Sequence, residues 1–220
     1  MALKASKLFT QPDLDRIAAA VNEAERKTSG EIVPYVVDRS DEYDEAVWRS
    51  GFLGVVAASA AFLLVRTFTD VWLSLSLTTI ILTTLAVGGL GLVSVHFIAG
   101  LKRFFAGKDL MMRRVSQRAA QAFISEEVFK THDRTGILIF LSLMERRVLV
   151  VGDSGINARV APAEWQDVVD RIVNGIRAGK PAEALIDAIQ QCGVLLETRG
   201  VAIRPDDRDE LRDDLRVGGD

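Results

Sequence analysis

The stretch VWLSLSLTTIILTTLAVGGLGLVSVHFIAGL, residues 71–101, contains no Asp, Glu, Lys or Arg in 31 consecutive positions. About 20 such residues are enough to cross the hydrocarbon core of a bilayer as an α-helix. The preceding residues 50–70 hold only Arg66 and Asp70, although the whole chain of 220 residues carries 27 Lys+Arg and 30 Asp+Glu. This uneven distribution of charge excludes a wholly soluble globular protein and predicts an integral membrane protein.

Two membrane-spanning helices are predicted within residues 50–101, and their expected bounds are about 48–65 and 71–98. The charged connection between them is only five residues long, so the two helices are expected to form an antiparallel hairpin. Small side chains allow two helices to approach closely. A close helix contact is therefore expected at the small residues of the first span, Gly54, Ala58 and Ala61.

The orientation of this hairpin follows from the cationic residues that flank it. Arg49 precedes the first span, and the residues after the second span include Lys102, Arg103, Lys108, Arg113 and Arg114. Because cationic flanks stay on the cytoplasmic side, the soluble segments and both termini are predicted to be cytoplasmic. In a bacterial host this means the inner (cytoplasmic) membrane.

Residues 1–49 contribute one predicted helix, which begins at Thr10 and ends at Ser29–Gly30, and one predicted strand, residues 31–37. Pro34 has no N–H to donate, which predicts an edge position or a bulge in that strand. One helix and one strand are too few to bury a hydrophobic core. The missing partners are expected from the sequence after the hairpin.

Residues 102–203 supply those partners. The predicted strand over 136–144 is apolar on both faces, so it is expected in the middle of a sheet with helices on each side. The other predicted elements are a helix over 111–129, a strand over 147–151 that completes an antiparallel β-hairpin, and helices that begin at Pro162 and Pro181.

An even number of spans returns the chain to the same side of the membrane. Residues 1–49 and 102–203 are therefore predicted to form one split cytoplasmic domain, a three-layer α/β sandwich that is interrupted by the transmembrane hairpin. Residues 204–220 carry four Arg against seven acidic residues and are predicted to be a disordered tail.

The run TGILIFLSLMERRVLVVGDSGI, residues 135–156, followed by Trp165 on a helix, resembles the TPM domain. This family is named for a thylakoid lumen protein, a photosystem-associated protein and a modulator of nematode acetylcholine receptors. SGEIVPYVV, residues 29–37, is similar to its first strand, and the inserted hairpin is similar to a bacterial membrane-protein branch. The resemblance implies a Rossmann-like α/β/α sandwich. Some relatives are described as acid phosphatases or calcium binders, others as assembly or maintenance factors.

The strongest ligand-site candidate is the turn at residues 152–157, with Asp153, Ser154 and Gly155. Backbone N–H groups of such a turn can bind an anion, and the carboxylate can bind a cation. In a second interpretation the turn's side chains only satisfy local backbone donors. Asp38, at the end of the first strand, begins a calcium site with Asp153 if both strand ends face one edge of the sheet.

We expect a non-enzymatic interaction or maintenance factor for another membrane protein, or a protein that self-associates in the bilayer. The alternatives are a phosphatase or metal-dependent hydrolase, or a calcium-binding module, each at the 152–156 loop. The sequence has no Gly-rich nucleotide signature, no Ser elbow and no paired Cys. No nucleic-acid partner is expected, since the basic residues after the second span are a topology signal.

Overall fold

A computed structural model describes residues 4–68, 76–201, 203 and 210–219. The chain divides into two compact units. The helical unit is Glu42–Met112, and the sheet unit combines Ala2–Asp41 with Arg113–Asp220. Residues 69–75, which include the end of the expected connection between the two spans, and residues 204–209 and 220 of the predicted tail lie outside the described residues.

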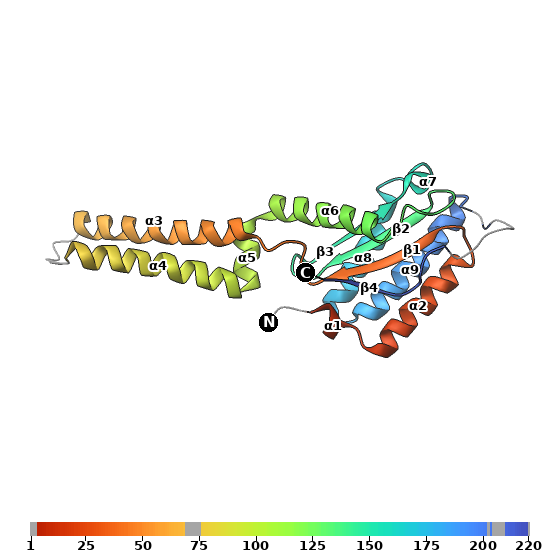
Figure 1. Cartoon of the computed structure of the whole chain (residues 1–220), viewed down its shortest axis with the longest axis horizontal. Helices are drawn as coiled ribbons and strands as arrows, with labels where there is room; N and C mark the ends of the chain where they lie inside the picture. Colours follow the sequence, from red (N-terminus) through yellow and green to blue (C-terminus); the bar gives the residue numbers. More distant parts are fainter. Residues whose placement is uncertain (1–3, 69–75, 202, 204–209, 220) are drawn as a thin grey trace. The chain divides into compact units, whose positions relative to one another are not determined.

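The sheet unit is built on a four-stranded sheet of order β3-β2-β1-β4 (Figure 1). Its strands are β1 Glu31–Val37, β2 Gly136–Ser142, β3 Arg147–Gly152 and β4 Arg216–Gly218. β1 runs parallel to β2 and to β4, and β2 runs antiparallel to β3 as the predicted hairpin. β1 and β2 lie on either side of the apolar segment in the sequence, so one sheet joins strands from both parts of the chain.

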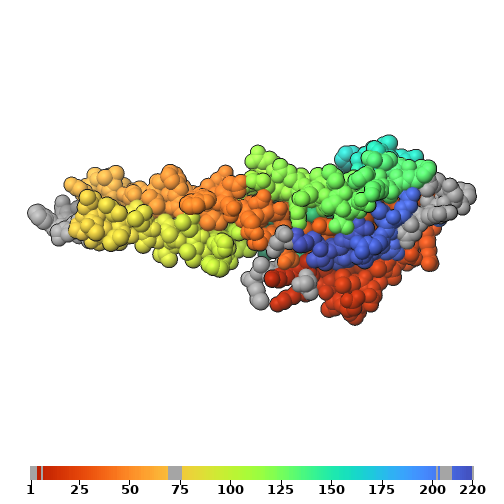
Figure 2. Space-filling view, viewed as in Figure 1, coloured from red at the N-terminus to blue at the C-terminus, as the bar shows by residue number. Residues whose placement is uncertain are grey.

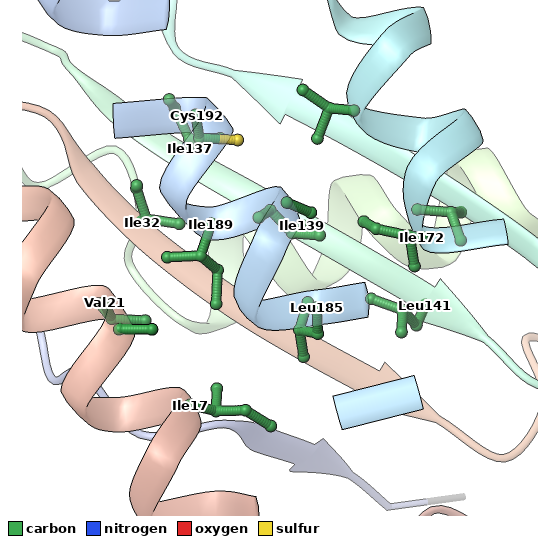
Figure 3. Close-up of a cluster of buried hydrophobic side chains, with 14 of the residues drawn as sticks. Ile17, Val21, Ile32, Ile137, Ile139, Leu141, Ile172, Leu185, Ile189 and Cys192 are labelled. Atoms are coloured by element: carbon green, nitrogen blue, oxygen red, sulfur yellow. The ribbon is translucent and has the colours of Figure 1, made fainter. Parts of the chain in front are cut away.

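One face of the sheet is covered by α2 Gln11–Glu25, α8 Glu164–Arg177 and α9 Pro181–Thr198. α2 begins where predicted, because the Asp13 carboxylate accepts hydrogen bonds from the N–H and the hydroxyl of Thr10. Alternate side chains of the two central strands pack against these helices in the core shown in Figure 3, which includes Ile32, Ile137, Ile139, Leu141, Leu185, Ile189 and Cys192.

The opposite face of the sheet packs against α6 Lys108–Ser125. The remaining side chains of β1 and β2 belong to this second core, where the rings of Tyr35 and Phe140 stack with centroids 5.8 Å apart. Every residue of both strands is buried. The prediction of a central β2 between two helical layers, and with it the α/β sandwich, is confirmed.

β1 differs from the prediction of an edge strand, because β4 pairs with its far side. That pairing covers only Tyr35, Val36 and Val37, and β4 begins opposite Tyr35, so β4 does not pair with Pro34. Pro34 keeps β2 as its neighbour, opposite Ile139. Pro34, which has no N–H to donate, therefore lies where β2 is the one described strand that pairs with β1.

The end of the chain differs from the predicted disordered tail, since residues 210–219 are described and include β4. Arg216 is 7% exposed and donates from Nη1 to Oε2 of Glu126 at 3.0 Å. Arg118 donates to the carbonyl of Gly219 at 2.6 Å. In Figure 2 this segment, in blue, lies beside the green α6. Charge alone predicts a solvated tail, but Arg216 and Glu210 have partners elsewhere in the sheet unit.

The helical unit consists of α3 Asp44–Phe68, α4 Leu77–Phe97 and α5 Ala99–Ala106. At about 1.5 Å per residue, α3 and α4 are about 37 and 32 Å long, against a hydrocarbon core of about 30 Å. Their apolar windows have mean hydropathies of 1.8 and 1.9, and only 6% and 17% of those residues are buried. Both helices are thus long and apolar enough to span a membrane, and neither is buried like the core helix of a soluble protein.

α3 and α4 approach each other closely at glycines. A Cβ on Gly88 of α4 would lie 2.7 Å from Cγ2 of Val55 and 3.2 Å from the carbonyl oxygen of Gly51. A Cβ on Gly54 would lie 3.2 Å from the carbonyl oxygen of Val87. The predicted contact at Gly54 is present, whereas Ala61, also expected there, is exposed.

Candidate functional site

The predicted ligand turn follows β3, and Asp153 is its central residue. Asp153 is the N-cap of the short helix α7 Ser154–Asn157, and its Oδ1 accepts a hydrogen bond from the N–H of Ser154 at 2.6 Å. The N–H of Asp153 donates to the carbonyl of Gly136 at 2.9 Å, which fixes the turn against the start of β2. The Asp153 side chain is only 5% exposed.

Arg134, in the loop before β2, supplies the counter-charge for this buried carboxylate. Its Nε lies 2.8 Å from Oδ2 of Asp153, and the Arg134 side chain remains 53% exposed. The guanidinium also lies over the ring of Phe129, 5.8 Å from its centroid. Arg134 therefore supplies the positive charge that an external cation would otherwise bring to this carboxylate.

Gly155 draws the same loop close to the turn. Its N–H donates to the carbonyl of Arg134 at 2.9 Å. A Cβ at Gly155 would lie 2.3 Å from the carbonyl oxygen of Asp133 and 2.7 Å from that of Arg134, so only glycine fits without a shift of the backbone. The N–H groups of Ser154 and Gly155, which were candidates for binding an anion, are thus both used within the chain.

Asp38 and Asp153 do not meet, and the proposed two-carboxylate metal site is wrong on this point. The register pairs the start of β1 with the start of β2 and the end of β3 with the start of β2. Asp38 follows β1 at the opposite end of the sheet, about 20 Å away along strands of seven residues. Its Oδ1 accepts from the N–H of Ala5 at 2.5 Å. Within the described residues, no three His, Cys, Asp or Glu side chains are grouped for a metal ion.

A buried polar cluster that the sequence did not reveal lies near Asp38, in the turn between β2 and β3. Glu145 is 4% exposed, and its carboxylate accepts from the N–H of Ser40 at 2.9 Å and from the hydroxyl of Ser142 at 2.5 Å. The hydroxyls of Ser40 and Ser142 lie 2.7 Å apart. The N–H of Met144 donates to the carbonyl of Asp38 at 2.9 Å. These bonds tie the β2–β3 turn to the segment that leaves β1.

Cys192 lies on α9 in the core of the sheet unit and is fully buried. Burial disfavours the thiolate and raises the pKa of the Cys192 thiol from 9.0 to about 12. A nucleophilic cysteine requires a lowered pKa and access to solvent. Cys192 is accordingly a packing residue of the core.

Comparison with known proteins agrees with this fold. The family model of the TPM domain matches residues 105–195, which confirms the resemblance seen in the sequence. The solved NMR structure of the BA42 protein from the psychrophilic bacterium Bizionia argentinensis is 19% identical in sequence. It aligns over 98% of this chain and 99% of its own, with a TM-score of 0.60, and at this identity the likeness concerns the fold alone. No curated protein matches the chain.

Proposed function

We propose that this TPM-domain protein is a membrane-anchored, non-enzymatic interaction or maintenance factor for another membrane protein or for a second copy of itself. The observation that carries the proposal is the state of Asp153, the best candidate for a catalytic carboxylate. Its Oδ1 accepts a hydrogen bond from the N–H of Ser154, and its Oδ2 forms an ion pair with Arg134, although Oδ2 accepts no hydrogen bond within the described residues. A turn held in this way stabilises the loop ahead of β2 and leaves interaction as the better-supported role.

The anchoring part of the proposal is supported by the outer surface of the helical unit. Large apolar side chains point outward along α3 and α4, with Trp48 71%, Phe52 69% and Leu85 60% exposed. Each such side chain contributes about 1.5–3 kcal/mol when it is removed from water. Insertion into a bilayer, with the cationic flanks in the cytoplasm, removes these side chains from water and so gains this free energy.

A partner can meet the protein through either unit. Since glycines form much of the contact between α3 and α4, many large side chains of both helices remain exposed for lipid or for the helices of another protein. The sheet unit also exposes apolar side chains, with Ile124 of α6 65% exposed and Val194 of α9 50% exposed.

Photocrosslinking in native membranes tests the proposal. A photoreactive residue is placed in the intact protein at 52 or 85 in the helical unit, and at 124 or 194 in the sheet unit. We expect a discrete crosslinked protein from at least one position, with the same partner found by mass spectrometry in repeated preparations. Adducts to lipid alone from all four positions would contradict an interaction role.

The phosphatase alternative is tested on the same intact protein in neutral detergent. We expect no phosphomonoester hydrolysis above that of a mock purification. Hydrolysis that is lost in Asp153→Asn but kept in Ser154→Ala would overturn the non-enzymatic proposal and assign a catalytic role to the carboxylate. A rise in thermal stability with Ca²⁺ that Asp153→Asn abolishes would instead favour a calcium-binding module.

A further inference from the structure

A cavity of about 390 Å³ opens in the sheet unit, at the end of the sheet where β2 turns into β3. Its volume falls in the range of about 300–1,000 Å³ that is typical of small-molecule sites. Most of its wall is aliphatic and comes from α1 Ala5–Leu8, the β2–β3 turn and α8, with Leu8, Leu143, Val148, Val173 and Ile176 as the main apolar residues.

Three arginines, Arg146, Arg147 and Arg177, also line this cavity, and its lining contains no Asp or Glu. None of the three forms an ion pair with a carboxylate in the described ranges of the chain. Several other arginines of the sheet unit do have such partners. Arg171, also on α8, contacts Asp187 at 3.2 Å. The cavity thus gathers three arginines that have no carboxylate partner in the described part of the chain.

The neutral polar group of the lining is already engaged. The Ser142 hydroxyl donates to Glu145 and lies 2.7 Å from that of Ser40. A ligand rich in hydroxyls, such as a sugar, would therefore find few partners on the aliphatic wall. A purely apolar ligand would leave the guanidinium groups without a partner, because their planar donors suit carboxylate or phosphate oxygens.

We propose that this cavity binds an anionic amphiphile, with an acyl chain against the aliphatic wall and a carboxylate or phosphate head held by the arginines. Two sources share this chemistry, a free fatty acid and an anionic phospholipid. The cavity lies entirely within the sheet unit. The ligand proposal rests on the proposed membrane anchoring in one respect, namely that the bilayer is one source of the ligand.

Photoaffinity labelling of the intact protein in neutral maltoside micelles tests the site. The probe is dodecanoic acid that carries a diazirine on its chain. We expect saturable labelling of the peptides that contain residues 143–148 and 173–177. Unlabelled dodecanoate should suppress this labelling about tenfold more effectively than dodecanol, because the alcohol lacks the charged head. Equal competition by dodecanol, or labelling only outside these peptides, would overturn the proposal.

Substitutions separate the cavity from general partition of the probe into micelles. The double variant Arg147→Gln/Arg177→Gln should lower labelling below saturation about tenfold, by loss of charge-assisted hydrogen bonds. Arg171→Gln is the matched control on α8 and should label as the wild type does. An unchanged melting temperature shows that the double variant is folded. Equal labelling of both variants would refute a role for the cavity arginines.

Two further competitors identify the source of the ligand. Competition by dioctanoyl phosphatidylglycerol as strong as that by dodecanoate assigns an anionic phospholipid. Competition by dodecanoate alone assigns a free fatty acid. Equal competition by zwitterionic dioctanoyl phosphatidylcholine and by phosphatidylglycerol contradicts the requirement for an anion. These results are independent of crosslinking to a protein partner, so either proposal can fail while the other stands.

Discussion

Replacement of Asp153 by alanine tests whether this residue locks the loop or serves a ligand. The substitution removes an N-cap acceptor, which contributes about 1 kcal/mol to the free energy of unfolding. It also removes the pair with Arg134, which contributes about 0.5–1 kcal/mol because the guanidinium is half exposed. The expected loss is about 1.5–2 kcal/mol. For a unit of this size, we expect the melting temperature to fall by roughly 3–8 °C.

Trp165 of α8 provides a fluorescent reporter for this experiment, because it is 6% exposed and packs in the core between α8 and the sheet. A background with Trp48→Phe and Trp72→Phe leaves its fluorescence as the signal of unfolding of the sheet unit in detergent. Asp153→Asn keeps an acceptor oxygen and loses the charge, so we expect about half of the alanine effect. Ser154→Ala is the control, since it keeps the N–H that Asp153 binds, and should change stability by less than about 0.5 kcal/mol.

The double variant Asp153→Ala/Arg134→Ala decides whether the two side chains act together. If the carboxylate and the guanidinium stabilise each other, the double variant loses less than the sum of the single losses, by about 0.5 kcal/mol or more. Strictly additive losses would refute the pairing. An Asp153→Ala variant as stable as the wild type would refute the lock itself and return Asp153 to the candidates for ligand binding.

Three other predictions concern the core, the hairpin and the topology. Burial raises the pKa of the Cys192 thiol to about 12, so the contribution of Cys192 to the free energy of unfolding is full below pH 9 and falls as the pH rises from 9 to 12. Cys192→Ala should therefore flatten the dependence of the free energy of unfolding on pH in this range. Iodoacetamide should alkylate the wild-type protein only when it is unfolded. Gly88→Leu should separate α3 from α4, because even a Cβ meets Val55 at 2.7 Å, and spin labels on the two helices should report a longer, broader distance. Reporter fusions at residues 40 and 160 should both be cytoplasmic, and fusions on opposite sides would contradict a sheet that joins β1 to β2.

The central layer of the fold was predictable because its signals are local. The run of β2, apolar at every position, fits only a strand that is covered on both faces, and α6 and α9 cover it. The even number of predicted spans placed β1 on the same side as β2, and their parallel pairing follows that expectation. The turn at Asp153 was predicted from its glycines and its carboxylate. In the structure, however, the N–H groups of Ser154 and Gly155 and the Asp153 carboxylate all contact other groups of the chain.

The remaining features depend on contacts that local composition does not encode. β4 has only three residues in an acidic stretch, and its place follows from the contact of Arg216 with Glu126, the residue after α6. The predicted meeting of Asp38 with Asp153 failed because β1 runs parallel to β2, which places the end of β1 far from the start of β2, where β3 ends. Glu145 looked like an ordinary turn residue, since its partner Ser40 is 105 positions away in sequence.

The parallel pairing of β1 with β2 sets an order on biosynthesis. Glu31 pairs with Gly136, so 105 further residues must be translated before the first strand meets its neighbour. At about 5–20 residues per second, the nascent β1 waits about 5–20 s with its backbone N–H and C=O groups unpaired by β2. The intervening α3 and α4 emerge from the ribosome during that interval, and a translocase can receive them before the sheet closes. Delay in their delivery therefore prolongs the exposure of an aggregation-prone strand.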